Sequence, residues 1–476
     1  MSGRLLLLFS WLAVLAGCAV NPVTGRSDFV MMSEQQELEL GRRYSQEVVK
    51  QSPPYADEAL QAYVQQVGER VARYGHRSNL AYHFSVVDSA EINAFALPGG
   101  YIYINRGLLA YLNSEAELAA VLGHEVGHVT ARHSVRQQSQ SMAWGILGQA
   151  VAIGSGVRLA GDLTNALGNA VVRGYGRDME LEADGLGAQY LARSGYDPRA
   201  MIEVVKILKN QEIFARDQAS RQGKVAPVGY HGLFDTHPDN DTRLHQVIGP
   251  AQALAGGQQE INRDVFLQHL EGLPLTDSAA TGVRRGQRFF HAELGFTLAF
   301  PPRWTLENQA SRLFGLSADE QAVMLVKLGE DPGGLEPLEY MYKYLGRRLL
   351  AAEGFEQNGL RGAMAILPGT PAKRVAVIYK DGRPFFFGGG VRSGSLEGHD
   401  QEFVSVIRSF RPLEEQEKAL AQPLRLHLIR ATGVQRMADL VKDDPQPDEA
   451  EARLRLLNNL YPSGEASPGE WLKILR

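Results

Sequence analysis

The chain has 476 residues, of which 44% are apolar and 22% are charged, and its formal net charge at pH 7 is −5. A chain of this length is expected to form more than one domain, each with a sizeable apolar core. The negative balance is small and spread without long runs. The composition therefore gives no basis for binding nucleic acid and excludes that class of partner.

The amino terminus has the pattern of a bacterial lipoprotein signal. Arg4 precedes an apolar run that is too short to span a membrane and that ends in Leu-Ala-Gly-Cys. We expect a signal peptide over residues 1–17, cleavage before Cys18, a lipid on that cysteine and a lipid-anchored tether over residues 18–33. A plain cleaved signal peptide or an uncleaved anchor is the alternative. The residue after this cysteine is alanine and not aspartate, which resembles the pattern of lipoproteins that Gram-negative cells send to the outer membrane.

The most informative motif is His-Glu-Val-Gly-His at residues 124–128. His124 and His128 are four residues apart, so on a helix they project from one face and can hold one zinc ion, while Glu125 reaches a water on that metal. Ser114 followed by Glu117 indicates the start of such a helix. A buried structural pair of histidines is the alternative that this motif alone leaves open.

A second acidic motif, Glu-Leu-Glu-Ala-Asp at residues 180–184, opens another helical pattern. Glu180 and Asp184 share one helix face. We expect Glu180 to be the third zinc ligand and Asp184 to accept a hydrogen bond from a ligating imidazole. Glu182 points away from that face and is expected to lie in solvent. An acidic helix start that serves only the helix dipole is the alternative.

The two motifs together resemble the minigluzincin metalloproteases, a family that includes the HtpX heat-shock protease, the CAAX prenyl protease and BepA-type periplasmic proteases. Three further segments resemble this family: Asn-Ala-Phe-Ala-Leu-Pro-Gly-Gly at 93–100, Thr-His-Pro at 236–238 with Arg243 after it, and Asn-Pro-Val-Thr-Gly at 21–25. The resemblance implies an α+β protein with a mainly helical, zincin-type metalloprotease domain over residues 34–250. It also implies a short edge-stranded sheet and one Zn²⁺ per chain.

The chemistry of these residues predicts peptide hydrolysis. Zinc on His124, His128 and Glu180 lowers the pKa of its water, which becomes the nucleophile, and Glu125 acts as general base. His237 and Arg243 are candidate catalytic stabilisers. As the resemblance implies, His237 is also a candidate fourth ligand that holds the resting enzyme closed. A capping role for His237 in the turn before Pro238 is the bland alternative.

The segment 101–105 follows a Pro-Gly-Gly turn and alternates aromatic and β-branched residues, which predicts a strand. A substrate peptide could add to an exposed edge of this strand, which would place Tyr101, Ile102 and Tyr103 in the substrate site. The resemblance implies that Asn93 lies near the substrate backbone. A core hairpin with Asn93 in a turn is the alternative.

The stretch from residue 137 to 157 contains no charged residue and is rich in glycine. It could be a membrane-contacting hairpin, a lid over the zinc or a buried helix pair. The apolar length is shorter than a membrane span and the glycines argue against a rigid one, so we favour the lid, with core packing as the alternative.

The second half of the chain contains no catalytic constellation. We expect a linker and short helix over 251–285 and a small α+β domain over 286–412, with a helix from Leu338 to Ala352. His291 and His399 are isolated and expected at the surface. Residues 423–476 resemble a LysM-like β-α-α-β module whose usual early Gly-Asp-Thr is absent, so both peptidoglycan contact and protein docking are open.

The sequence therefore predicts a hydrolase, a zinc metalloendopeptidase of the cell envelope. It is expected to face the periplasm from a lipid anchor, on the outer membrane, and to cleave unfolded or misassembled periplasmic or outer-membrane proteins in quality control. The alternative is a zinc-bound, largely closed lipoprotein that acts as a chaperone or docking factor for outer-membrane assembly or the cell wall. The presence of Glu125 favours the protease, because a structural zinc site needs no base.

Overall fold

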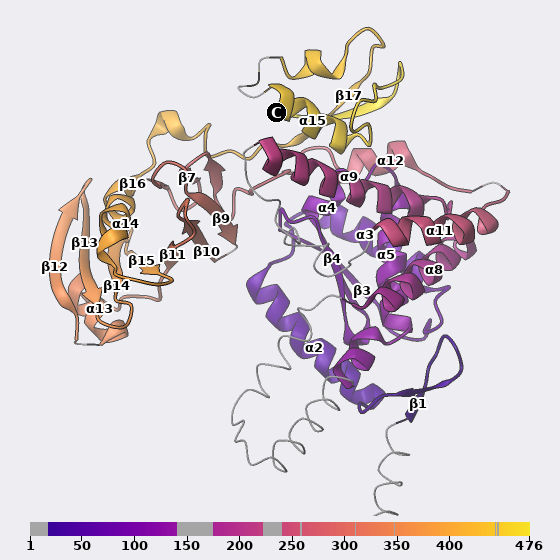
Figure 1. Cartoon of the computed structure of the whole chain (residues 1–476), viewed down its shortest axis with the longest axis horizontal. Coiled ribbons are helices and arrows are strands. Elements are labelled where there is room, and N and C mark those ends of the chain that lie inside the picture. Colours follow the sequence, from indigo (N-terminus) through magenta and orange to yellow (C-terminus); the bar gives the residue numbers. More distant parts are fainter. Residues whose placement is uncertain are drawn as a thin grey trace, which may run out of the picture. The chain divides into compact units, whose positions relative to one another are not determined.

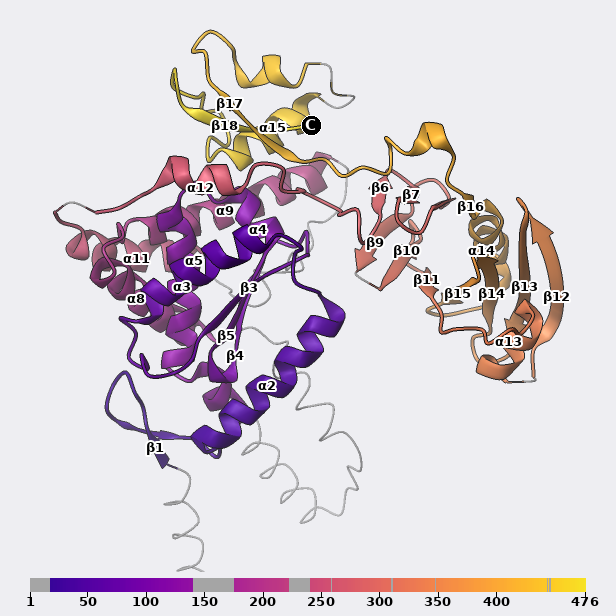
Figure 2. The same cartoon turned by 180° about the vertical axis from the view of Figure 1, so that it is seen from behind.

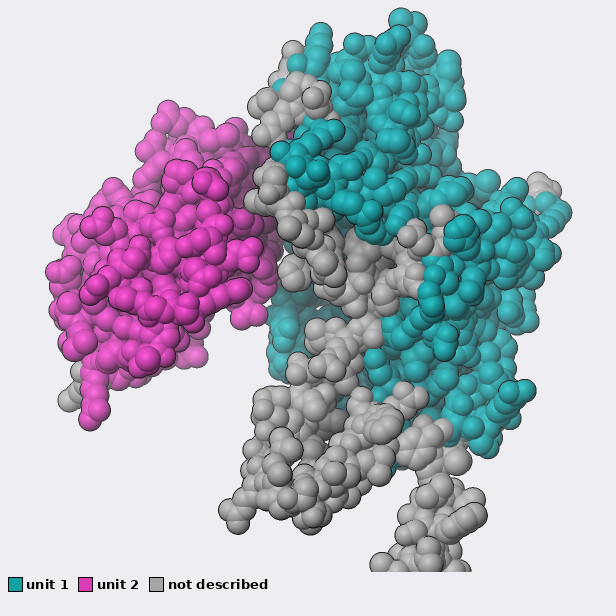
Figure 3. Space-filling model, in the orientation of Figure 1, with its two compact units in different colours: residues 1–273, 425–476 teal, residues 274–424 magenta. Residues whose placement is uncertain are grey.

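The computed structural model describes residues 18–139, 175–221 and 240–476, apart from six single residues. These are Gln258, Ala310, Arg347, Asp443, Pro445 and Gln446. The chain divides into two compact units, residues 1–273 with 425–476 and residues 274–424 (Figure 3). The predicted α+β class is confirmed, because a mainly helical region with the candidate metal ligands precedes a region rich in β-strands.

The first unit is built from helices around a small sheet (Figure 1). Its helices are α2 (Glu34–Gln51), α3 (Glu58–Ala72), η1 (Pro98–Gly100), α4 (Arg106–Tyr111), α5 (Glu115–Thr130), α8 (Arg177–Arg193), α9 (Ala200–Arg221), α11 (Asn240–Leu254) and α12 (Arg263–His269). Its strands before the C-terminal segment are β1 (Cys18–Val20), β2 (Ser27–Phe29), β3 (His83–Val87), β4 (Ala94–Leu97) and β5 (Tyr101–Asn105). None of the helices in the described ranges is both long and apolar enough to cross a membrane.

Helix α5, which carries the histidine motif, is the centre of this unit. The Ser114 hydroxyl accepts the N–H of Glu117 at 3.2 Å, so the predicted helix start is confirmed. The reciprocal half of a capping box, a bond from the Ser114 N–H to the Glu117 carboxylate, is replaced by one from the N–H of Asn113, which that carboxylate accepts at 2.6 Å. Every residue of α5 is buried, so its polar side chains are enclosed by protein as well.

Strand β5 lies in the middle of the three-stranded sheet, parallel to β3 on one side and antiparallel to β4 on the other. The prediction of an exposed edge at 101–105 is therefore wrong, because neighbouring strands use both edges. Figures 1 and 2 show α2 on one side of the sheet and α3 and α5 on the other. Because both faces are covered, Ile102 and Tyr103 are buried, and the alternating apolar residues fit a strand packed on both faces.

The C-terminal segment belongs to the same unit as the helices. It consists of β17 (Leu426–Arg430), η3 (Met437–Leu440), α15 (Pro447–Leu457) and β18 (Trp471–Leu475), and the two strands pair antiparallel. The first of the two helices expected in a LysM-like module is only the short turn η3. The Lys473 ammonium is buried and donates to the carbonyl oxygens of Ala110 and Leu112, each at 2.7 Å. These carbonyls lie at the end of α4, where the helix itself offers them no partner.

The second unit is rich in antiparallel strands. Its strands are β6 (Val283–Arg285), β7 (Arg288–His291), β8 (Phe296–Ala299), β9 (Thr305–Gln309), β10 (Arg312–Leu316), β11 (Ala322–Leu328), β12 (Leu350–Gln357), β13 (Leu360–Leu367), β14 (Lys373–Lys380), β15 (Arg383–Val391) and β16 (Arg411–Pro412). Its helices are α13 (Pro337–Leu345), α14 (Glu397–Ser409) and η2 (Glu415–Glu417). One sheet has seven strands in the order β12-β13-β14-β15-β11-β10-β9, and a second has four in the order β16-β8-β7-β6.

Two predictions for this unit are wrong. The helix expected over 338–352 ends at Leu345, because Gly346 takes a left-handed φ of 84° and the chain continues into β12. His291 is not at the surface: only 7% of the residue is exposed, and its ring lies 5.5 Å from that of Phe296. His399 hydrogen-bonds to Glu402 at 2.7 Å.

The predicted tether contains a small hairpin in which β1 and β2 pair antiparallel. Asn21 holds the turn, since its side chain donates to Asp28 at 2.7 Å and accepts the N–H of Val23 at 2.8 Å. The predicted signal peptide, residues 1–17, lies outside the described residues.

Candidate metal centre

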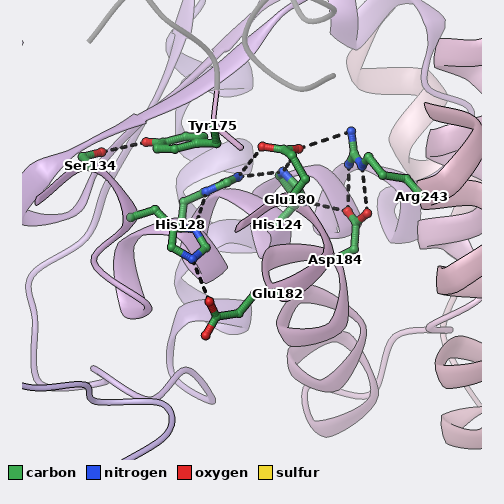
Figure 4. A network of polar contacts seen from close by, with 9 residues as sticks. His124, His128, Ser134, Tyr175, Glu180, Glu182, Asp184 and Arg243 are labelled. Atoms are coloured by element: carbon green, nitrogen blue, oxygen red, sulfur yellow. Dashed lines mark hydrogen bonds and ion pairs between the residues drawn. The ribbon is translucent and has the colours of Figure 1, made fainter. Parts of the chain in front are cut away.

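Two helices bring together the three predicted metal ligands. The ligand atoms of His124 and His128 from α5 and of Glu180 from α8 lie within 4.8 Å of one another (Figure 4). The two Nε2 atoms are 2.9 Å apart, and the Glu180 carboxylate oxygens lie 3.5 Å from that of His124 and 3.4 Å from that of His128. All three side chains are buried.

The helices can approach this closely because glycine lines their contact. A Cβ on Gly127 of α5 would lie 3.0 Å from the carbonyl oxygen of Ala183 on α8. A Cβ on Gly187 of α8 would lie 3.0 Å from the backbone nitrogen of His124. Backbone atoms cannot move aside as a flexible side chain can, so a larger residue at either position would separate the helices. Sequence reasoning overlooked this role of the glycine in the motif itself.

Asp184, one turn after Glu180, holds the first imidazole as predicted from spacing. Its Oδ1 lies 2.8 Å from Nδ1 of His124. Arg243 from α11 donates to both oxygens of Asp184, at 2.7 and 2.8 Å, and lies 3.4 Å from Glu180. Burial alone would raise the pKa of Asp184, but Arg243 and His124 hold it well below its usual range. Asp184 is therefore an anion, and Arg243 contacts this carboxylate in addition to lining the cavity described below.

The second imidazole has a different set of partners, which sequence reasoning missed. Nδ1 of His128 lies 2.7 Å from Nδ1 of His133, and Nε2 of His133 lies 3.1 Å from the Glu182 carboxylate. The Tyr175 ring stacks on His128 with centroids 4.0 Å apart, and its hydroxyl bonds to Ser134 at 2.7 Å (Figure 4). Glu182 does point away from the ligands, but it is not simply solvated, because it pairs with His133.

The donor set fits a metal ion such as zinc, which favours imidazole nitrogen and carboxylate oxygen. Burial would lower the pKa of His124, but its hydrogen bond to Asp184 raises that pKa to about 9. A metal ion would compete with a proton for these nitrogens, and His124 would keep its Nδ1–H on Asp184.

Glu125, the predicted base, lies beside this group in an apolar setting. Only 1% of the residue is exposed. It lines a small cavity together with His124 and Arg243. The rest of the lining is apolar: Leu108, Ala120, Val121, Met201, Val204 and Leu208.

The remaining predicted residues have separate positions. Asn93 directly precedes β4, and its carbonyl oxygen accepts the N–H of Asn105 at 2.9 Å. Tyr101 begins the central strand and is half-buried. His237 lies outside the described residues, as does most of the predicted lid, from residue 140 to 157. Lipidation of Cys18, at the start of β1, stays a prediction.

Comparison with known proteins agrees with this geometry. Residues 58–251 match the family model described as Peptidase family M48. Over this segment, called the M48 region below, the chain is similar to the M48 peptidases. The M48 region extends from the first residue of α3 into α11, and it contains His124, His128 and Glu180, the candidate zinc-binding group.

Proteins similar to the M48 region occur in bacteria and mitochondria. The chain is 32% identical over 244 residues to a beta-barrel assembly-enhancing protease of Yersinia pestis, covering 49% of this chain and 47% of that protein. It is 29% identical to the Escherichia coli protein of that name, covering 54% and 52%. It is also 35% identical over 173 residues to the mitochondrial metalloendopeptidase OMA1 of Arabidopsis thaliana, covering 36% and 32%. The chain thus spans about half the length of its bacterial relatives.

Proposed function

We propose that the chain is a zinc-dependent endopeptidase of the bacterial envelope. The observation that carries this proposal is a buried carboxylate, Glu125, next to a group of three ligands. A structural zinc site usually closes with four protein ligands, whereas a catalytic site keeps one position open and has a base at hand.

The residues divide the reaction between them. Zinc bound by His124, His128 and Glu180 would supply a polarised water and a Lewis acid for the scissile carbonyl. Glu125 removes a proton from the attacking water and returns it to the leaving amine. Asp184 keeps Nδ1 of His124 protonated, so that its Nε2 presents a lone pair. His237 joins the group either as a stabiliser or as a resting ligand.

We propose that the substrate backbone binds along β4 and not along β5. β4 is the edge strand of the sheet on the side that packs on α5, and Asn93 directly precedes it. An extended peptide that pairs with this edge would gain affinity from backbone hydrogen bonds that are independent of sequence. The apolar cavity beside Glu125 favours an apolar substrate side chain next to the cleaved bond.

The setting is the cell envelope. The predicted lipid on Cys18 would fix the enzyme to the outer membrane, facing the periplasm, and its substrates would be unfolded or misassembled envelope proteins. The names of the bacterial relatives, beta-barrel assembly-enhancing proteases, support such substrates. The LysM-like segment serves protein docking or contact with peptidoglycan.

Cleavage of casein and of an unfolded outer-membrane β-barrel tests the proposal. We expect one zinc per chain in the wild type, and Glu125→Gln should keep the zinc yet cleave at least about 100-fold more slowly. His237→Ala should cleave faster if this histidine is a resting ligand and more slowly if it is a stabiliser. A wild type and His237→Ala that both bind zinc, and cleave no more than Glu125→Gln does, would contradict the endopeptidase.

A further inference from the structure

The two imidazoles of the candidate zinc group are held by unequal partners. A carboxylate, Asp184, contacts Nδ1 of His124 directly at 2.8 Å. For His128 the partner is another imidazole, because Nδ1 of His133 lies 2.7 Å from its own Nδ1, and the carboxylate of Glu182 stands one residue further on. Nδ1 of His128 thus reaches a carboxylate through a second imidazole, in a relay, whereas Nδ1 of His124 faces a carboxylate directly.

Only one arrangement of protons satisfies this relay when His128 binds a metal. A metal-bound His128 offers the lone pair of Nε2, so its Nδ1 carries the proton and donates. His133 must then accept at Nδ1, which puts its own proton on Nε2, where the Glu182 carboxylate accepts it at 3.1 Å. Each group has one donor facing one acceptor, and the arrangement turns the lone pair of His128 Nε2 toward the candidate ligand group.

The backbone is bent to bring His133 to this place. Helix α5 ends at Thr130, and Arg132 takes a left-handed φ of 56°, a conformation that residues other than glycine rarely adopt. The Arg132 side chain is itself buried and paired with Glu37 at 2.9 Å. A strained residue held in place by its surroundings marks a position that the fold keeps for a purpose. Here the turn directs His133 back toward His128.

The relay is enclosed but anchored at its outer end. The His133 side chain is fully buried, and three-quarters of the Glu182 side chain is covered. Arg136 pairs with Glu182 at 3.1 Å and with Asp28 at 3.2 Å, so the carboxylate has a fixed position. A histidine that only filled space would not need a carboxylate aligned behind it.

We propose that His133 is a positioning residue, which together with Glu182 holds His128 in the tautomer and orientation that present Nε2 to zinc. This inference rests on the proposed zinc site and adds to it the residues that prepare one of its ligands. Partners of this kind contribute about 10- to 100-fold to metal affinity in other zinc proteins.

Zinc affinity of the full chain, measured by competition with a chromophoric chelator, tests the proposal. His133→Phe keeps a ring but offers no acceptor, and it should weaken zinc binding at least 10-fold. His133→Asn places an amide oxygen where Nδ1 was, so it should recover most of that loss. The matched control is His76→Phe, since His76 bonds to the Tyr190 hydroxyl at 2.7 Å and touches no ligand; its zinc affinity should equal that of the wild type.

Glu182→Ala allows a second measurement of zinc affinity. The Glu182 side chain is partly exposed, so this substitution should not prevent folding. It should weaken zinc binding several-fold, and it decides the matter if His133→Phe does not fold. The positioning role is overturned if His133→Phe folds and binds zinc within twofold of the wild-type affinity. If His133→Phe does not fold, the same result in Glu182→Ala overturns it. A wild type that binds zinc tightly but cleaves nothing overturns the proposed function instead, and leaves the positioning role standing if these variants lose zinc.

Discussion

The metal group of the first unit and the core of the second unit use burial in opposite ways. Around the metal group, charged side chains are enclosed: Glu180, Asp184 and Arg243 are each at most 3% exposed. The core of the second unit is apolar and rich in aromatic rings, among them Phe403 and Phe410, which are fully buried. Burying a charge opposes folding unless a partner compensates, whereas burying an aromatic ring favours it. The contrast locates the chemistry in the first unit.

The largest effect is expected from breaking the charge network. Arg243→Met should lower the free energy of unfolding by about 3–5 kcal/mol in the zinc-free chain, because it strands the buried carboxylate of Asp184. The change in the free energy of unfolding is measured by urea titration, with hydrogen exchange of the α8 amides as the probe. The control is Arg216→Met, which removes an exposed pair with Glu212 and should change stability by less than about 1 kcal/mol. If both variants lose the same stability, the buried charges around the candidate ligands matter no more than exposed ones.

A substitution in the core of the second unit should lower stability by a similar amount without changing zinc affinity. Phe403→Ala empties a site where the ring packs against the backbone of Gly389, and should lower stability by about 3–5 kcal/mol. Hydrogen exchange in β14 and β15 reports the loss, while zinc affinity should not change. Leu350→Ala, at a residue 57% exposed, is the control and should change stability by less than about 0.5 kcal/mol. Weakened zinc binding in Phe403→Ala would show that the two regions are not independent.

Between pH 6.5 and pH 4, acid should destabilise the second unit through His291. Burial among aromatic rings lowers the pKa of His291 from 6.5 to about 4. Between these two values the unfolded chain binds a proton at this residue and the folded chain does not. The stability from this group is complete above pH 6.5 and is lost as the pH falls toward 4, roughly 3 kcal/mol in all. Unfolding of β7 and β8 measured across this range should show the loss, and His291→Phe should remove it. An unchanged pH dependence in that variant would refute the assignment.

The smallest effect concerns a charge of the first unit that lies away from the metal. Lys473→Met leaves the carbonyl oxygens of Ala110 and Leu112 unpaired, but it also removes a polar nitrogen whose burial is unfavourable and lowers its pKa, so the loss should be about 1–2 kcal/mol. Lys206→Met, which removes an exposed pair with Glu203, should have almost no effect. Hydrogen exchange in α4 and the first turn of α5 is the measurement. A loss as large as that of Arg243→Met would mean that every buried charge here matters equally.

The sequence predicted those parts of the site that depend on spacing along one helix. His124 and His128 lie four residues apart, as do Glu180 and Asp184, and the structure brings both pairs together. Sequence reasoning failed where the answer depended on segments far apart or on backbone conformation. The order of strands made β5 central. Nothing about an arginine at position 132 indicated the left-handed turn that carries His133 to His128. The burial of His291 comes from Phe289 on its own strand and from Phe296, its partner across the β7–β8 hairpin, a pairing that the isolated histidine did not reveal.

The hairpin near the amino terminus shortens the stretch of chain that directly follows Cys18. Residues 18–29, if extended, would reach about 40 Å. Because β1 and β2 pair, Phe29 lies opposite Cys18, and this length adds almost nothing to the reach. Asp28 is further fastened to Arg136 at 3.2 Å, directly behind Glu182. If Cys18 carries the proposed lipid, the hairpin would hold the first unit close to the membrane, and the proposed cleavage would take place at the membrane surface.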